Sequence, residues 1–162
     1  MRRLDLTLGD LAATARLGHL LAADLDAGDV LALDGPLGAG KSVLARAVIT
    51  RLCPREIDIP SPTFTLVQTY EPTAGPSVMH FDLYRLESPD DALELGIEEA
   101  FIDSVCLIEW ARRLGPYLPR TALNLSIGFE PDGDDRRHVT LAGGARWRPV
   151  LERIESGMKG PI

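Results

Sequence analysis

One stretch decides the fold of this 162-residue chain, and it reads Gly35-Pro36-Leu37-Gly38-Ala39-Gly40-Lys41-Ser42. It matches the pattern G-x-x-x-x-G-K-[ST], found in loops whose backbone N–H groups cradle phosphate. The apolar run 30–33 before it is typical of a buried parallel strand, and apolar residues recur at helical spacing over 43–48 after it. Strand, glycine loop and helix therefore stand in the order that this motif requires.

The chemistry of this stretch follows from its residue types. Gly35, Gly38 and Gly40 let the backbone turn so that successive N–H groups point at one anion. The helix N-terminus beside them favours phosphate through its unpaired N–H groups and its dipole. We expect Lys41 to reach the β- and γ-phosphates and the Ser42 hydroxyl to ligate Mg²⁺. A glycine-rich turn with a solvated lysine is the alternative, but the element order favours a site for a nucleoside triphosphate.

Length and charge narrow the class of protein. We expect residues 1–155 to form a single domain of the phosphate-loop kind and residues 156–162 to be a flexible tail. The net charge of −7 argues against a protein that binds nucleic acid on its own, because such proteins usually carry a basic face.

Several features predict a cytoplasmic protein. Cys53 and Cys106 stand in apolar surroundings without metal or redox spacing, which is typical of buried thiols in a reducing compartment. Asp5 and Asp10 interrupt any apolar region that could form a signal peptide. No apolar run approaches the roughly 20 residues that a membrane helix needs.

The remaining segments predict an α/β fold. Helices are expected over 10–24, from Ser88 to about Gly96, and over 148–154. Strands are expected at 63–70, 78–84, 105–108, 122–129 and 138–141. The first two of these strands flank a Pro/Gly loop and should be antiparallel. Together these elements indicate a P-loop NTPase-like three-layer fold, with a mixed, mainly parallel central sheet and antiparallel side strands, whose strand order the sequence does not give.

Two acidic residues stand where a Mg·ATP site would need them. Glu109 directly follows an apolar strand, and ligands of open α/β sheets collect at the carboxyl ends of strands. It is a candidate to hold Mg²⁺ or to polarise the attacking water, and a surface acid is the alternative. Asp82 shares one strand face with His80 and Tyr84. It is a candidate to lie beside the γ-phosphate, although an ordinary solvated face is the alternative.

Weaker candidates surround these residues. Ser61-Pro62-Thr63 falls where many phosphate-loop proteins carry a switch threonine that senses Mg²⁺ and the γ-phosphate, and a strand cap is the alternative. The pairs Arg112–Arg113 and Arg136–Arg137 are candidates to contact a base, a phosphate or a partner, although such pairs are usually solvated. Trp110 is a candidate to pack against the nucleotide loop or to serve an interface, with core burial as the alternative.

Taken together, four segments of the chain resemble the TsaE family of bacterial P-loop ATPases, which support threonylcarbamoyladenosine formation in tRNA. The segments are Leu37–Ser42, Ser61–Val67, His80–Leu86 and Leu107–Trp110. The glycine loop is shared by many families, whereas the other three segments in this order are specific to this one. The resemblance extends from Leu11 to Thr140 and so covers nearly the whole chain.

The resemblance implies an ATPase that uses Mg²⁺ and ATP and works with the proteins TsaB and TsaD. TsaD transfers the threonylcarbamoyl group to the adenosine, and the TsaE-like subunit resets or regulates it by hydrolysing ATP. Hydrolysis is expected to be slow for the subunit alone and faster with its partners. The chain would then reach tRNA only through the complex, and no membrane is involved.

The resemblance also assigns roles by position. Ser42 and Glu109 match the Mg²⁺ ligands, and Asp82 and Thr63 match the positions of hydrolysis and γ-phosphate sensing. Nucleotide binding is assigned to Leu11, Leu37, Gly38, Ala39, Gly40, Lys41, Ser42, Val43 and Arg137, of which the first and last match regions bordering the adenine.

Some positions depart from the pattern of the family. Pro36 replaces a common acidic residue, and Val43 replaces a threonine, which removes a side-chain donor worth about 1 kcal/mol. A small-molecule kinase is the alternative reading, but it needs an arginine-bearing lid, and the chain after Glu109 is short for one. A signalling GTPase is disfavoured because no Asn-Lys-x-Asp segment is present, which indicates adenine or weak base selectivity.

Overall fold

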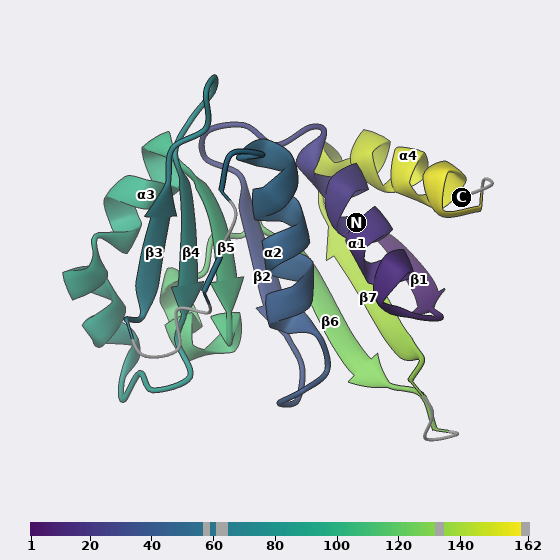
Figure 1. The fold of residues 1–162 in the computed structure, drawn as a ribbon. Coiled ribbons are helices and arrows are strands. Elements are labelled where there is room, and N and C mark those ends of the chain that lie inside the picture. The colour runs from purple at the N-terminus through teal and green to yellow at the C-terminus, as the bar shows by residue number, and fades with distance from the viewer. Residues whose placement is uncertain (57–58, 61–64, 132–134, 160–162) are drawn as a thin grey trace.

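A seven-stranded sheet forms the centre of the molecule (Figure 1). The structure is a computed structural model that describes residues 1–56, 59–60, 65–131 and 135–159. The strands are β1 (Arg2–Leu8), β2 (Val30–Asp34), β3 (Val67–Tyr70), β4 (Val78–Asp82), β5 (Val105–Glu109), β6 (Leu123–Phe129) and β7 (Arg137–Gly143). The helices are α1 (Leu11–Ala22), α2 (Lys41–Leu52), α3 (Ile97–Asp103) and α4 (Arg148–Lys159), with 3₁₀ helices η1 (Pro89–Leu95), η2 (Ala111–Tyr117) and η3 (Ala145–Trp147).

The strand order is β1-β7-β6-β2-β5-β4-β3. The four central strands, β6, β2, β5 and β4, are mutually parallel. Antiparallel pairing places β7 and β1 on one side of them and β3 on the other. The predicted fold class, a mixed sheet that is parallel around the glycine loop and antiparallel at its sides, is confirmed.

The sheet carries an apolar cluster on each face, which gives the expected three layers. On β2, Leu31 and Leu33 belong to the cluster that packs against α1, α2 and α4. The alternate residues Val30 and Ala32 belong to the cluster that packs against α3 and the 3₁₀ helices η1 and η2. All four side chains are at most 1% exposed. A strand buried on both faces reads as a continuous apolar run, which explains why the sequence signal was clear.

Helix α1 begins where the sequence predicts, and its cap is the Asp10 carboxylate, which accepts a hydrogen bond of 2.9 Å from the backbone N–H of Ala13. The segment after Ser88 starts with the expected cap and stops at Gly96, whose φ is 75°, but its form is 3₁₀. At the C-terminal end, α4 continues to Lys159, beyond the predicted end at Ile154. Met158 packs against the core cluster there, which accounts for the extra turn.

Strand β1, helix α3 and the 3₁₀ helices η2 and η3 were not predicted. Strand β1 pairs with β7 along its whole length, and its Leu4 and Leu8 are buried while most of the residues between them are not. The alternating leucines Leu4, Leu6 and Leu8 are typical of a strand with one buried face. Along the described part of the chain, no helix is long and apolar enough to cross a membrane.

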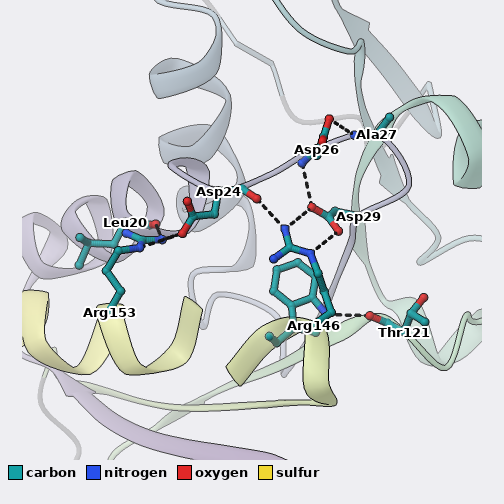
Figure 2. A network of polar contacts seen from close by, with 9 residues as sticks. Leu20, Asp24, Asp26, Ala27, Asp29, Thr121, Arg146 and Arg153 are labelled. Atoms are coloured by element: carbon teal, nitrogen blue, oxygen red, sulfur yellow. Dashed lines mark hydrogen bonds and ion pairs between the residues drawn. The ribbon is translucent and has the colours of Figure 1, made fainter. Parts of the chain in front are cut away.

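An ionic network holds the C-terminal elements to the connection between α1 and β2 (Figure 2). The Arg146 guanidinium donates to both carboxylate oxygens of Asp29, at 3.2 and 2.7 Å, and to the carbonyl oxygen of Asp24. Arg153, one helix further on, donates to the Asp24 carboxylate and to the carbonyl oxygen of Leu20. These contacts fix α4 over α1 at the end of β2 that lies opposite the glycine loop.

Candidate functional site

The glycine loop joins the carboxyl end of β2 to the start of α2, as predicted. Gly35 has a φ of 148°, and a Cβ there would collide with the backbone carbonyl of Ile127 on the neighbouring strand. Gly38 and Gly40 have φ values of 80° and 116°, in the region that glycine adopts at no steric cost. Within the described chain, no side chain caps the start of α2. The N-terminus of this helix is therefore built to meet an anion.

Lys41, the first residue of α2, folds back over its own loop. Its ammonium donates to the carbonyl oxygens of Gly35 and Pro36, at 2.6 and 3.0 Å, and lies 4.3 Å from the centroid of a Trp110 ring. The residue is 4% exposed. Burial lowers the pKa of Lys41, while the nearby carboxylates, Glu109 first among them, oppose that shift. The two carbonyl oxygens and the Trp110 ring thus hold the ammonium at the loop, where it can pair with an anion.

Glu109 connects three elements at one point. Its Oε1 accepts a hydrogen bond of 2.8 Å from the hydroxyl of Ser42 on α2, and its Oε2 lies 2.7 Å from Nε2 of His80 on β4. Glu109 ends β5 and is 2% exposed, so the alternative of a surface acid is wrong. The structure thus joins the two residues to which the resemblance assigned Mg²⁺.

Asp82 ends β4, directly opposite Glu109 in the parallel register of β4 and β5. It is 4% exposed and accepts a hydrogen bond of 3.0 Å from the backbone N–H of Tyr84. Its own N–H donates to the carbonyl of Leu66, a residue with a φ of 69°. The alternative of a solvated strand face is wrong for Asp82 and for His80, which is fully buried.

These side chains surround a hollow of about 200 Å³ over the start of α2. Its lining consists of Leu37, Gly38, Gly40, Lys41, Ser42, Val43, Asp82, Glu109 and Trp110. Residues proposed for phosphate, for metal and for hydrolysis therefore share one cavity, although they come from three separate segments of the sequence. Thr63, the candidate for sensing the γ-phosphate, lies outside the described residues.

The donor set of this hollow suits Mg²⁺. Ser42 and Glu109 offer a hydroxyl and a carboxylate oxygen 2.8 Å apart, and Asp82 lies on the adjacent strand end. Magnesium prefers such hard oxygen ligands, and it usually takes one or two from the protein and the rest from water and phosphate. The described residues contain no group of three or more His, Cys, Asp or Glu able to enclose a metal.

A second, larger hollow of about 570 Å³ lies on the other side of the glycine loop. Its lining combines the start of α1, the loop and the start of β7, namely Asp10, Leu11, Ala12, Thr14, Gly38, Ala39, Gly40, Val43, Asp135 and Arg137. Arg137 donates to the carbonyl of Ala39 at 3.1 Å, and Leu11 is 72% exposed. The structure thus brings Leu11 and Arg137, distant in sequence, to the same side of the loop, where a base could extend.

Two residues matter more to the site than the sequence alone indicates. Trp110 lines the first hollow, and His80 lies behind it against Glu109. Trp110 has a φ of 58°, and its ring packs against Tyr84 with centroids 5.0 Å apart as well as against Lys41. The alternation of β4 contained the signal for His80, because it requires His80 and Asp82 to share a face.

Comparisons with known proteins agree with the resemblance. The model of the family described as "Threonylcarbamoyl adenosine biosynthesis protein TsaE" matches residues 8–139. A protein of that name from Rickettsia felis is 41% identical over 124 residues, which cover 75% of this chain and 72% of the relative. One from Bacillus subtilis strain 168 is 37% identical over 143 residues and 87% of each chain.

A solved structure supports the same assignment. The crystal structure of Bacillus subtilis YdiB matches with a TM-score of 0.78 at 30% identity, and the match covers 96% of this chain and 95% of that one. The likeness therefore includes the whole P-loop NTPase-like sheet and not only the glycine loop. With a family model that spans most of its length, the chain belongs to the TsaE family.

Proposed function

We propose that this protein is a Mg²⁺-dependent ATPase subunit required for threonylcarbamoyladenosine formation in tRNA. The observation that carries the proposal is the meeting of Lys41, Ser42, Glu109 and Asp82 around one hollow at the glycine loop of a TsaE-family chain. A site that only bound nucleotide would not need a second buried carboxylate beside the first. Two carboxylates at adjacent strand ends provide separately for the metal and for the attacking water.

Each residue then has a distinct task. Lys41 exchanges the carbonyls of Gly35 and Pro36 for the β- and γ-phosphates, and the loop N–H groups from Leu37 to Val43 hold the remaining phosphate oxygens. Ser42 and Glu109 hold Mg²⁺, which, when bound, neutralises charge that develops on the phosphates. Asp82 orients the attacking water, and Thr63 senses the γ-phosphate.

The larger hollow takes the nucleoside in this proposal. Leu11 packs against the adenine and Arg137 borders it, with the guanidinium kept in place by the Ala39 carbonyl and by the Phe129 ring 4.6 Å away. Glycine, alanine and aliphatic residues make up six of the ten residues that line this hollow, which supports modest selectivity for the base. Val43 lines both hollows and therefore stands where the α-phosphate would pass from one to the other.

In this proposal, ATP hydrolysis by this chain acts on partner proteins, and the chain itself does not transfer the threonylcarbamoyl group. We propose that the protein acts in the cytoplasm with TsaB and TsaD and resets or regulates the TsaD transferase between turnovers. The net charge of −7 suits a subunit that docks on proteins and leaves tRNA to them. Because the catalytic groups lie at strand ends and loops, docking of the partners is expected to complete the site and to raise a slow basal rate.

The test is release of ADP and phosphate from Mg·ATP by the protein alone and with the TsaB–TsaD pair of the same organism. Slow release that rises strongly with the pair is expected. Glu109→Ala should lose the Mg²⁺-dependent turnover while keeping ATP affinity within about tenfold. Glu94→Ala, an exposed acid on η1, is the matched control and should behave as the parent.

Two results would contradict the proposal. If Glu109→Ala hydrolysed ATP at the parent rate, the metal assignment would be wrong. If the pair neither bound nor stimulated the protein, the role with TsaB and TsaD would fail. In that case, phosphate transfer to small acceptors, the reaction of a P-loop kinase, becomes the activity to assay.

A further inference from the structure

His80 is a buried polar residue without a place in the proposed mechanism. It lies in the middle of β4, two residues before Asp82, and its side chain is 0% exposed. Nε2 lies 2.7 Å from Oε2 of Glu109, whereas Nδ1 is buried and has no hydrogen-bond partner among the described residues. The imidazole is thus aimed at a single neighbour, the carboxylate that faces Ser42.

This contact determines how the Glu109 carboxylate can turn. A carboxylate is an acceptor only, so the close approach identifies Nε2 as the nitrogen that donates. With Oε2 held by β4 and Oε1 held by the Ser42 hydroxyl, the carboxylate plane is fixed from both sides. If the Ser42 hydroxyl turns from Glu109 to a bound metal, Glu109 keeps its contact with His80. That contact leaves Oε1 facing the start of α2.

Packing alone does not explain a histidine at this position. In the register of β4 and β5, His80 stands opposite Leu107. This leucine is fully buried and packs in the apolar core on the same face of the sheet. Burying polar groups costs free energy unless they are fully paired, and replacement of a buried polar pair by apolar side chains is often neutral or stabilising. An apolar pair at positions 80 and 109 would therefore serve the core at least as well.

We propose that His80 is a positioning residue of the metal site, which holds Glu109 so that Oε1 is presented to the cation beside Ser42. This inference rests on the proposed function, because it assumes that Glu109 is a metal ligand. The role resembles the outer-shell hydrogen bonds that orient metal-binding side chains in other proteins. Loss of such a bond typically costs 10- to 100-fold in metal affinity or activity.

The test measures metal binding directly. Mn²⁺ replaces Mg²⁺, a non-hydrolysable ATP analogue is present, and the free Mn²⁺ signal in electron paramagnetic resonance gives the dissociation constant. His80→Leu should weaken Mn²⁺ binding by about tenfold or more. His80→Gln keeps an N–H donor of similar reach and should restore most of the affinity. Phe81→Leu, a buried change on the opposite face of β4, controls for lost packing and should bind Mn²⁺ as the parent does.

A double-mutant cycle gives the sharpest form of the test. If His80 acts through Glu109, then adding His80→Leu to Glu109→Ala should weaken Mn²⁺ binding no further. Parent-like binding by His80→Leu, equal loss in the leucine and glutamine variants, or a loss that adds fully to that of Glu109→Ala would each overturn the inference. If Glu109→Ala itself binds Mn²⁺ as the parent does, the metal assignment of the proposed function has failed instead.

Discussion

The two ends of β2 use the same kinds of side chain for opposite purposes. At its amino end, Arg146 and Arg153 pair with Asp29 and Asp24 in a network that is partly open to water (Figure 2). At its carboxyl end, Lys41 and the two carboxylates of the hollow are at most 4% exposed, and the ammonium donates to backbone carbonyls. At the amino end, each arginine is paired with a carboxylate of the protein. The carboxyl end instead holds buried charges that a ligand would satisfy better.

This contrast has an energetic consequence. Exposed ion pairs contribute little to stability, and buried charges cost free energy unless they are well paired. Substitutions at the carboxyl end should therefore change binding or turnover more than folding. Substitutions at the amino end should change folding alone. The predictions below test this division, beginning with the largest effect.

Lys41→Ala should abolish tight ATP binding. Truncating one partner of a buried charge contact costs about 2–5 kcal/mol, much of it from the charge left unpaired. Isothermal titration with ATP measures the loss. The midpoint of urea unfolding should stay at or above the parent value, since the substitution removes a buried ammonium. Near-parent ATP affinity would show that the lysine stays on its own loop carbonyls when ATP binds.

Asp82→Asn should slow hydrolysis without weakening ATP binding. The amide keeps the size of the side chain and an oxygen for the N–H of Tyr84, but it is no longer a base. Loss of a positioned base typically costs 10²–10⁴-fold in rate. Single-turnover hydrolysis measures the rate and titration with ATP measures binding. Asp103→Asn, before the amino end of β5, is the control. Loss of ATP binding instead would make Asp82 a structural residue.

Arg146→Ala, at the other end of β2, should lower the free energy of unfolding by about 1 kcal/mol. The substitution removes the contacts to Asp29 and Asp24 and the packing of the guanidinium on the Trp147 ring, 4.7 Å away. Urea unfolding measures the change. ATP affinity should stay at the parent value, and a clear loss of it would mean that the two ends of β2 are coupled.

Sequence reasoning succeeded where one local pattern carried the whole signal. The glycine loop, the buried strand before it and the helix after it all follow from neighbouring residues, and the structure has them as expected. The resemblance then supplied roles that spacing alone could not give. Those roles stay predictions, although the structure brings most of the residues together.

What the sequence could not give depends on contacts between distant segments. Nothing local says that β4 lies beside β5, yet this register is what sets Asp82 opposite Glu109 and aims His80 at it. Likewise, no neighbouring residue indicates that the N–H of Trp110, whose φ is positive, donates to the carbonyl of Leu33 on β2. Strand β1 is different, because its alternating leucines are a local strand signal and only its pairing with the distant β7 needs the structure.

The smallest predicted effect concerns an exposed pair on β1. The Arg3 guanidinium, helped by Thr140 and His138, lowers the pKa of Asp5 from 3.8 to about 2. The stability that this carboxylate contributes is therefore complete above its unfolded value and disappears as the pH falls towards 2. Urea unfolding at about pH 5 and about pH 3 should show a smaller loss on acidification for Asp5→Asn than for the parent. An equal loss in both proteins would mean that the pair with Arg3 is open in solution, and the amino end of β2 would then be the better example of a surface network that holds.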